Sequence, residues 1–385
     1  MFSSRTNWNL VPNALHQLLE KKRAAGERIL DLTDSNPTRC GFTYDPALLR
    51  DLSTQQSLLY EPDPRGLLIA RKAIAEQYAR RHTPIDPSNI ILTAGTSEAY
   101  SYLFRLLCNP GDNVLVPKPS YPLFDYLCTL NDVEARHYRL RYDDGWHIDR
   151  ESLSESVDSS TRAILLVNPN NPTGSFVKRK DREAIVEIGC EHGIALISDE
   201  VFGEFPLGTG NAFESCASEN KGVVFTLNGV SKWLGLPQLK LAWITISGPG
   251  KLKEEAASRL EVISDTYLAV STPAQQSLPS LIERGHSVTV QIKNRLEQNL
   301  GFLRQTLEHT PLSVLHVEGG WNAIVRLPNT RSDELWATRI LDKGNVLVYP
   351  GHYFEIDRDV CVVVSLLLEA SLFTEGIRST LAIVG

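Results

Sequence analysis

The sequence predicts an α/β protein with a mostly parallel central sheet in a large domain and a smaller α+β domain built from both chain ends. Between residues 89 and 270, apolar runs that fit buried strands alternate with helical patterns, which is typical of βα units. Beyond residue 276, one long helical pattern leads into mixed strands and helices. A chain of 385 residues also exceeds one ordinary core. We therefore expect a large domain over residues 43–275 and a small domain over residues 1–42 and 276–385.

The expected elements follow one another along the chain. The N-terminal segment lacks the basic start and cleavage site of a signal peptide, and it fits a first helix. Six apolar runs are the expected strands of the large sheet: residues 89–94, 113–117, 162–168, 193–199, 222–228 and 241–247. A helix is expected over residues 178–192. The small domain should hold a long helix at 289–309, strands at 321–328, 346–350 and 361–368, a helix at 332–344 and a closing helix.

Composition and charge narrow the class of partner. A net charge of −7 and a pI of about 5.8 argue against a nucleic-acid-binding surface. The sequence has no apolar run of about 18 residues that could cross a membrane. We therefore expect small-molecule partners and a cytoplasmic location. The six cysteines form no CxxC pair and no metal-ligand spacing, so we expect reduced thiols and no metal site.

Ligands of open parallel sheets bind at the carboxyl ends of the strands, so the residues that follow each apolar run are the informative ones. After the first run, Gly95, Thr96 and Ser97 precede a helical pattern. Backbone N–H groups and two hydroxyls at a helix N-terminus suit a phosphate group, while an ordinary Thr or Ser cap is the alternative. The sequence contains neither GxGxxG nor GxxxxGK[ST], which argues against a dinucleotide or a P-loop nucleotide.

Two further strand ends carry polar side chains. The third run leads into the segment NPNNPTG, whose two Asn-Pro steps turn the backbone and hold amide side chains at the sheet edge. Taken alone, this segment would be ordinary turn chemistry. Asp199 comes at the end of an apolar strand, where an unpaired carboxylate is unfavourable, so it needs a cationic partner unless it caps a helix.

Two lysines lie in the otherwise apolar stretch over residues 228–243. An apolar setting lowers the pKa of a lysine and makes it nucleophilic, which fits Lys232, whereas a solvated surface lysine is the alternative. Lys240 follows in the same stretch. Together, the strand ends require a ligand with a phosphate, a hydrogen-bond acceptor, a basic nitrogen opposite Asp199 and a carbonyl that a lysine attacks. Pyridoxal phosphate has all four groups.

The motifs NPNNPTG, SDEVF and SKWLGLPQLKLAW, in this order and spacing, resemble those of fold-type I pyridoxal-phosphate enzymes of the class I/II aminotransferase family. The resemblance runs almost end to end. It implies the fold of type I PLP-transferases and the transfer of an amino group between an amino acid or amine and a keto acid. It also implies that Lys232 forms the Schiff base with the cofactor and that Asp199 pairs with the pyridine nitrogen.

The same resemblance implies further cofactor contacts. Asn171 matches the residue that hydrogen-bonds the phenolic oxygen of the ring, and Tyr121 matches the aromatic residue that stacks on the ring. The expected phosphate contacts are Gly95, Thr96, Ser97, Ser231 and Lys240. Tyr60 resembles the tyrosine that reaches the phosphate of the neighbouring subunit, which implies a homodimer with shared active sites.

Four positions depart from the family pattern. Lys240 stands where an arginine is usual, and it supplies the charge without the two-pronged contact of a guanidinium. Phe202 lacks the hydroxyl of a common tyrosine, and Gly229 replaces a common serine of the phosphate site. Val363 stands where an arginine usually binds the carboxylate of the substrate.

Three explanations for the absence of that arginine remain open: another cation holds the carboxylate, the substrate has no carboxylate at this place, or catalysis has been lost. Arg39 is the candidate cation for the carboxylate, with a plain surface charge as the alternative. Asn36, Asn171 and Trp321 are the other candidate substrate-side residues, and a packed core residue is the alternative for the tryptophan. The alternatives to transamination are a lyase, cyclase or other non-transaminating enzyme of the same fold, and a catalytically inactive protein that binds pyridoxal phosphate.

Overall fold

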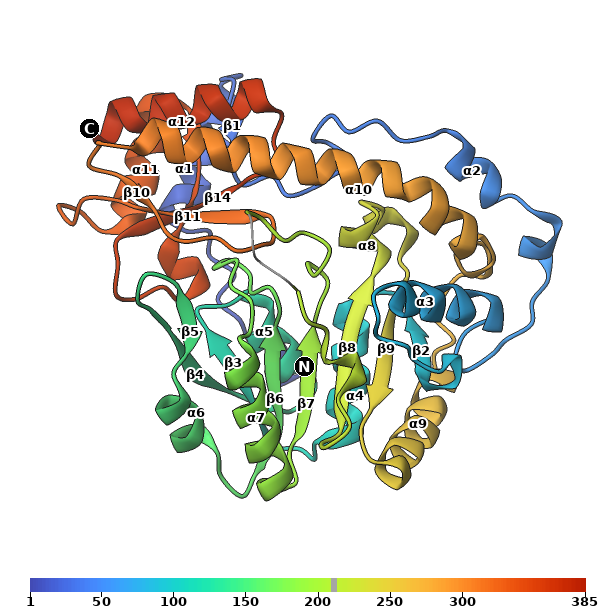
Figure 1. Cartoon of the computed structure of the whole chain (residues 1–385). Coiled ribbons are helices and arrows are strands. Elements are labelled where there is room, and N and C mark those ends of the chain that lie inside the picture. Colours follow the sequence, from blue (N-terminus) through green and yellow to red (C-terminus); the bar gives the residue numbers. More distant parts are fainter. Residues whose placement is uncertain (209–212) are drawn as a thin grey trace.

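The computed structural model describes residues 1–208 and 213–385. An eight-stranded sheet and a four-stranded sheet form its two β layers, and the long helix α10 (Thr272–Leu307) runs past both of them (Figure 1). The order in the large sheet is β2-β9-β8-β7-β6-β3-β4-β5. Its strands are β2 (Ile90–Thr93), β3 (Asn113–Lys118), β4 (Glu134–Tyr142), β5 (Trp146–Ile148), β6 (Thr161–Val167), β7 (Ala195–Asp199), β8 (Val224–Gly229) and β9 (Ala242–Ser247).

The centre of the large sheet is parallel. Strands β4, β3, β6, β7 and β8 pair in parallel, whereas β9 pairs antiparallel with both β8 and β2, and β5 pairs antiparallel with β4. Each of the six apolar runs expected to be a strand forms a strand of this sheet, and helix α7 (Arg179–His192) connects β6 to β7. The predicted mostly parallel α/β fold is therefore confirmed.

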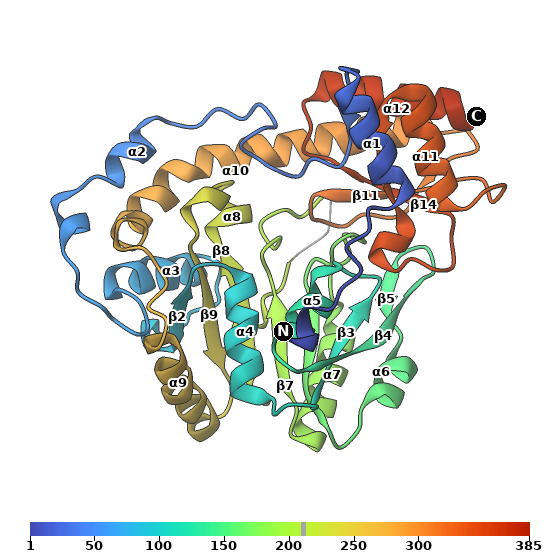
Figure 2. The same cartoon turned by 180° about the vertical axis from the view of Figure 1, so that it is seen from behind.

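Helices cover both faces of the large sheet, because successive side chains of each strand point to opposite faces. In β6, Leu165 and Val167 pack in a core with α4, α5 and α9, whereas Ile164 and Leu166 pack in a second core with α6 and α7. Figure 1 shows α6 and α7 in front of the sheet, and Figure 2 shows α4, α5 and α9 from behind. Besides α7, the helices of this part of the chain are α3 (Leu68–Arg80), α4 (Thr96–Leu107), α5 (Leu123–Leu130), α6 (Arg150–Ser156), α8 (Val230–Trp233) and α9 (Gly250–Asp265).

The second sheet is built from the C-terminal part of the chain. Its order is β10-β11-β14-β13, and all of its pairings are antiparallel. A separate parallel pair joins β1 to β12 with Leu30 opposite Val346, which ties the N-terminal segment to the C-terminal part. The elements of this part are α1 (Ala14–Ala24), β1 (Leu30–Asp31), β10 (Ser313–Val314), β11 (Asn322–Arg326), α11 (Asp333–Gly344), β12 (Val346–Leu347), β13 (Tyr349–Pro350), β14 (Cys361–Ser365) and α12 (Ala370–Val384). The short helix α2 (Ala47–Asp51) lies along α10.

Helix α10 spans the distance between the two β layers. One end contacts α3 beside the large sheet and the other contacts α12 beside the small one, as both views show. The expected domain boundary after residue 275 falls inside this helix, and the division into two domains stays a prediction. Within the described ranges, no helix has the length and apolar character needed to span a membrane. The carboxyl ends of β7 and β8 point toward α10 and the small sheet, which defines where the site residues gather (Figure 1).

Candidate active site

Asp199 and Lys232 lie at the carboxyl ends of two neighbouring parallel strands. Asp199 is the last residue of β7, Lys232 lies in α8 directly after β8, and the two strands pair with Asp199 opposite Leu227. Asp199 is 7% exposed, and burial raises the pKa of its carboxyl group, although the nearby Lys232 opposes this shift. Burial lowers the pKa of Lys232, and the charge of Asp199 opposes that shift in turn. The fold therefore places Lys232 near Asp199, although the sequence analysis had assigned the two residues to different groups of the ligand.

Two aromatic rings enclose the lysine. The Nζ atom of Lys232 lies 5.0 Å from the ring centroid of Trp321 and 5.6 Å from that of Phe202. The two rings meet edge to face at 5.4 Å. Trp321 is 1% exposed, and its Nε1 atom has no hydrogen-bond partner within the described residues. Trp321 is thus both a core residue and a wall of the site, and Phe202 offers the lysine a ring face without a hydroxyl.

A group of positively polarised donors lies at the start of α4. Gly95 is the N-cap residue of this helix, with Thr96 and Ser97 in its first turn. The Nζ atom of Lys240 lies 3.4 Å from the position that a Cβ atom on Gly95 would occupy. An ammonium beside the free N–H groups of a helix N-terminus favours an anion. Ser231, also predicted for this contact, directly precedes Lys232 in α8.

The loop that carries Asn171 is hydrogen-bonded to the segment between β10 and β11. The backbone N–H groups of Glu318 and Gly319 both donate to the carbonyl of Gly174, at 3.1 and 2.8 Å. Gly174 has a φ of +68°, and a Cβ atom there would lie 2.6 Å from the carbonyl oxygen of Gly319, so only glycine fits this contact. The amide of Asn322 donates to Oδ1 of Asn171 at 2.7 Å. This bond occupies Oδ1 of Asn171, so the Nδ2 group is the part of the side chain that remains available as a donor.

The other predicted site residues lie on more open parts of the surface. Tyr121, between β3 and α5, is 45% exposed, and Tyr60 is 75% exposed. Asn36 accepts hydrogen bonds from the backbone and hydroxyl of Thr38, so its side chain shapes a turn. Arg39 is exposed, and its side chain has no hydrogen-bond or ion-pair partner within residues 1–208 and 213–385. The structure describes no hydrogen bond from Asn36 or Arg39 to Lys232, Asp199 or Trp321.

Two of the departures from the family pattern are explained by packing. Val363 is 1% exposed, pairs with Ile324 across the small sheet and belongs to an apolar cluster with Trp146 and Phe354. At Gly229, a Cβ atom would lie 2.8 Å from that of Ala242 and 3.0 Å from the carbonyl oxygen of Leu241. Neither position therefore offers space for the polar side chain that the family usually has.

Two residues of the site escaped the sequence analysis. Tyr100 on α4 donates from its hydroxyl to Oδ2 of Asp199 at 2.8 Å, and Asn322 on β11 contacts Asn171 as described above. Tyr100 lies one helical turn after Thr96, which was the only sequence signal that could have pointed to it. Asn322 carried no local signal, because its partner lies 151 residues away.

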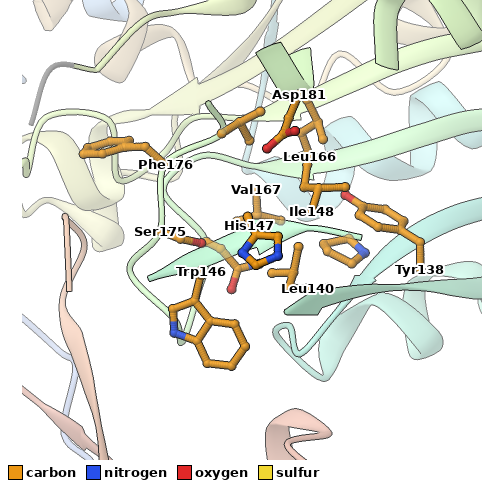
Figure 3. A pocket seen from close by; sticks show the side chains of 13 residues that line it. Tyr138, Leu140, Trp146, His147, Ile148, Leu166, Val167, Ser175, Phe176 and Asp181 are labelled. Carbon is orange, nitrogen blue, oxygen red and sulfur yellow. The ribbon is translucent and has the colours of Figure 1, made fainter. Parts of the chain in front are cut away.

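A separate small pocket is lined by residues of β4, β5 and β6 and by the loop that follows β6, which also carries Asn171 (Figure 3). It encloses about 20 Å³ and is lined by Tyr138, Trp146 and His147, among others. None of its lining residues is among those predicted for the site. The pocket is therefore distinct from the Lys232 site, although both adjoin the same loop.

A sequence model of the family described as "Aminotransferase class I and II" matches residues 44–369. The chain belongs to this family. The match confirms the predicted family, and with it pyridoxal phosphate as the cofactor and a transferase as the class of enzyme. The groups described above fit this cofactor, because they combine a helix N-terminus with an ammonium, a buried carboxylate and a lysine of lowered pKa.

Similar proteins include several aminotransferases. The chain is 32% identical to nicotianamine aminotransferase 1 of Oryza sativa subsp. japonica over 57% of its own length and 45% of that protein. It is 29% identical to the glutamate-pyruvate aminotransferase AlaA of Escherichia coli K12 over 71% of its own length and 68% of that protein. The matched segment thus spans about half to two thirds of these curated relatives.

Solved structures agree on the fold. The alanine aminotransferase of Pyrococcus furiosus superimposes with a TM-score of 0.89 at 23% identity, over 98% of both chains. An aminotransferase from Escherichia coli gives a TM-score of 0.88 at 23% identity, over 100% of this chain and 98% of that one. The expected type I fold of PLP-transferases is therefore confirmed.

Proposed function

We propose that the protein transfers an amino group between an amino acid or amine and a keto acid, with Lys232 as the lysine that binds the cofactor covalently. The observation that carries this proposal is the position of Lys232 near the buried Asp199, at the carboxyl ends of the neighbouring strands β7 and β8. The names of the relatives, which are alanine, glutamate-pyruvate and nicotianamine aminotransferases, support transamination as the reaction.

Pyridoxal phosphate, when bound, condenses with amines and draws electrons away from the carbon that carries the amino group. Lys232 has a lowered pKa, so a larger fraction is a free amine, which serves both as a nucleophile and as a proton carrier at the substrate carbon. Asp199, held as an anion, keeps a proton on the pyridine nitrogen. The Oδ1 atom of Asn171 is occupied by Asn322, so Asn171 would donate from Nδ2 to the phenolic oxygen of the bound cofactor.

The phosphate is proposed to bind at the start of α4. The N–H groups around Gly95 and Thr96, the hydroxyls of Thr96, Ser97 and Ser231, and the ammonium of Lys240 supply its donors. The proximity of Lys240 to Gly95 supports this assignment, because an ammonium in that place needs an anion. Tyr121 is proposed to cover the ring face, and a half-exposed aromatic side chain suits that role.

The carboxylate of the substrate needs a different partner from the usual arginine. Val363 is buried among apolar side chains and offers no charge. Arg39, which is exposed and free of described side-chain partners, is the proposed cation, with Asn36 and Trp321 as proposed substrate-side neighbours. The absence of a charge at Val363 favours a lyase or cyclase as the second candidate. A carboxylate that is held differently turns the substrate relative to the cofactor ring, and the bond that lies perpendicular to the ring is the one that breaks.

A homodimer with shared active sites is part of the proposal. Tyr60 is 75% exposed, and its neighbours Leu58 and Leu59 are 85% and 56% exposed. Such an apolar surface favours contact with another protein surface. Sedimentation analysis of the purified chain should give a dimer, and a fully active monomer would contradict this part. A cytoplasmic location is proposed on the composition of the chain.

The direct test is covalent trapping of the cofactor on the lysine. Borohydride reduction of the protein loaded with pyridoxal phosphate should add the cofactor mass to the peptide that contains Lys232. Lys232→Ala should abolish this covalent labelling, whereas Lys251→Ala, which removes an exposed lysine of α9, should not. Labelling of another lysine would contradict the assignment.

A panel of amino donors then identifies the reaction. A transaminase converts one donor to its keto acid and stores the amino group on the cofactor, which can be measured spectroscopically after a single turnover. Release of ammonia or of an unsaturated product without storage of the amino group would instead support the lyase. Arg39→Ala should raise KM for donors that carry a carboxylate and leave KM for simple amines unchanged.

A further inference from the structure

Tyr100 donates a hydrogen bond to the carboxylate at the centre of the site. Its hydroxyl lies 2.8 Å from Oδ2 of Asp199, and the side chain is 3% exposed. The other carboxylate oxygen, Oδ1, accepts the backbone N–H of Val201 at 3.1 Å. Each oxygen of this buried carboxylate is therefore held by one donor from the protein, which leaves further lone pairs for a ligand.

Packing fixes the Tyr100 ring. It meets Phe124 edge to face at 5.3 Å between centroids and lies tilted against Phe104 at 6.0 Å. Tyr100 also comes four residues after Thr96 on α4, so both residues lie on the same face of one helix. The helix whose N-terminus forms the proposed phosphate site therefore also positions the hydroxyl on Asp199.

The electrostatic setting keeps the phenol a donor. The pKa of Tyr100 is raised well above its ordinary value, first by burial and then by the charge and hydrogen bond of Asp199. The hydrogen bond from Tyr100 in turn opposes the effect of burial on the pKa of Asp199. Tyr100 thus stabilises the charged form of Asp199 without giving up its own proton.

Other titratable groups face this pair. Lys232 favours the charged form of Asp199. Burial raises the pKa of Glu200 to about 7, and the like charge of Asp199 adds to that shift. Cys128 on α5 faces Tyr100, and burial raises the pKa of its thiol to about 12, so it stays neutral. Of the protein groups around Asp199, only Tyr100 and Val201 donate hydrogen bonds to its carboxylate within the described residues.

We propose that Tyr100 is a positioning residue for the cofactor, whose hydroxyl keeps Asp199 ionised and in a fixed orientation toward the protonated pyridine nitrogen. The inference rests on the proposed function and deepens it. Tyr100 acts through Asp199, and not by contact with the reacting atoms. Because Tyr100 and Thr96 share one helix, the phosphate and the ring nitrogen are located by a single rigid element.

The proposal predicts a pH-dependent loss of cofactor affinity in Tyr100→Phe. Without the hydroxyl, the buried carboxylate has one hydrogen bond fewer, and its pKa rises. A neutral Asp199 no longer pairs with a charged pyridine nitrogen. The loss of affinity should therefore increase as the pH falls through this raised pKa and decrease at higher pH.

Equilibrium dialysis of the apoprotein against pyridoxamine 5′-phosphate measures this affinity without Lys232, because that ligand has no aldehyde. Tyr100→Phe should weaken binding about tenfold or more at neutral pH, as is typical for a lost hydrogen bond to a charged group. The matched control is Tyr138→Phe, which removes another buried hydroxyl. Tyr138 is 1% exposed, donates to the carbonyl of Leu165 at 2.7 Å and lines the small pocket of Figure 3. This control should bind like wild type.

The outcomes separate the two proposals. Equal affinities of Tyr100→Phe and Tyr138→Phe at every pH would overturn the role of Tyr100 and leave the proposed function standing. Failure of the wild-type protein to bind the ligand would overturn both. A loss of affinity in Tyr100→Phe that does not change with pH would also overturn the role of Tyr100, since a purely structural defect gives that result.

A second variant guards against a general folding defect. In the Asp199→Asn background, the side chain carries no charge for Tyr100 to stabilise. Adding Tyr100→Phe should then change the affinity by less than about twofold, which is the expected outcome for residues that act as a unit. An effect as large as in the wild-type background would contradict the proposal.

Discussion

The fit of Gly229 against its neighbouring strand can be tested with Gly229→Ser. This change introduces the serine that the family commonly has next to the phosphate. In this chain, the new Cβ atom would lie 2.8 Å from Cβ and 3.1 Å from Cα of Ala242, and 3.0 Å from the carbonyl oxygen of Leu241. Favourable contacts between carbon atoms begin at about 3.5 Å, so the added atom overlaps its neighbours.

The strain cannot be relieved by a side-chain rotation, because two of the three atoms belong to the backbone. Gly229 pairs with Ala242 across β8 and β9, and the backbone N–H of Val230 donates to the carbonyl oxygen of Leu241 at 3.1 Å. The strands must therefore separate directly before α8, which carries Lys232. Overpacking of this kind costs roughly 1–3 kcal/mol, so we expect a destabilisation of about 2 kcal/mol, or about 30-fold in the unfolding equilibrium.

Chemical unfolding of the apoprotein measures this loss. Gly145→Ser is the matched control, since no atom lies within 4 Å of its Cβ position, and it should unfold like wild type. Adding Ala242→Gly to Gly229→Ser should restore part of the stability, because it removes the Cβ contact and leaves the carbonyl contact. A Gly229→Ser protein that is as stable as wild type and binds pyridoxal phosphate more tightly would refute the steric argument.

Two further predictions concern charged side chains. Lys240→Ala should weaken the binding of pyridoxal phosphate but not of unphosphorylated pyridoxal. Lys240→Arg should retain the affinity, because a guanidinium also binds phosphate. If Lys240→Ala holds the cofactor as firmly as wild type, Lys240 does not bind the phosphate. The Nε2 atom of His137 lies 3.5 Å from Oδ1 of Asp125, and its Nδ1 atom lies 3.4 Å from Oε2 of Glu355. The pKa of His137 is raised, mainly by the hydrogen bond with Asp125. A folded-state pKa above the unfolded one stabilises the protein at low pH, and this contribution is lost as the pH rises through the folded-state pKa. His137→Gln should therefore be less stable than wild type by up to about 1 kcal/mol near pH 5, and the two should converge near pH 9 in unfolding experiments.

Sequence patterns predicted the layers of this fold well because they depend on local chemistry. Six apolar runs became six strands of the large sheet, and the residues at or just after their carboxyl ends include Gly95, Asp199 and Lys232. The carboxyl ends of parallel strands meet at one edge of a sheet, so residues at these positions converge without further information. The same patterns did not predict the strands β4 and β5, because neither contains a continuous apolar run.

The contacts that complete the site lay beyond the sequence. Tyr100 and Asp199 are 99 residues apart, and Asn171 and Asn322 are 151 residues apart, so no local pattern joins either pair. Likewise, Gly229 and Val363 looked like missing polar groups, until the packing around them revealed positions without space or solvent.

The sequence by itself determined the fold class, the cofactor and the residue types at the strand ends, because periodicity and short motifs encode them. Only the tertiary structure decided which side chains support those residues. Hydrogen bonds and close packing depend on atoms that approach within a few ångströms after the chain has folded, and their partners come from helices and strands far apart along it.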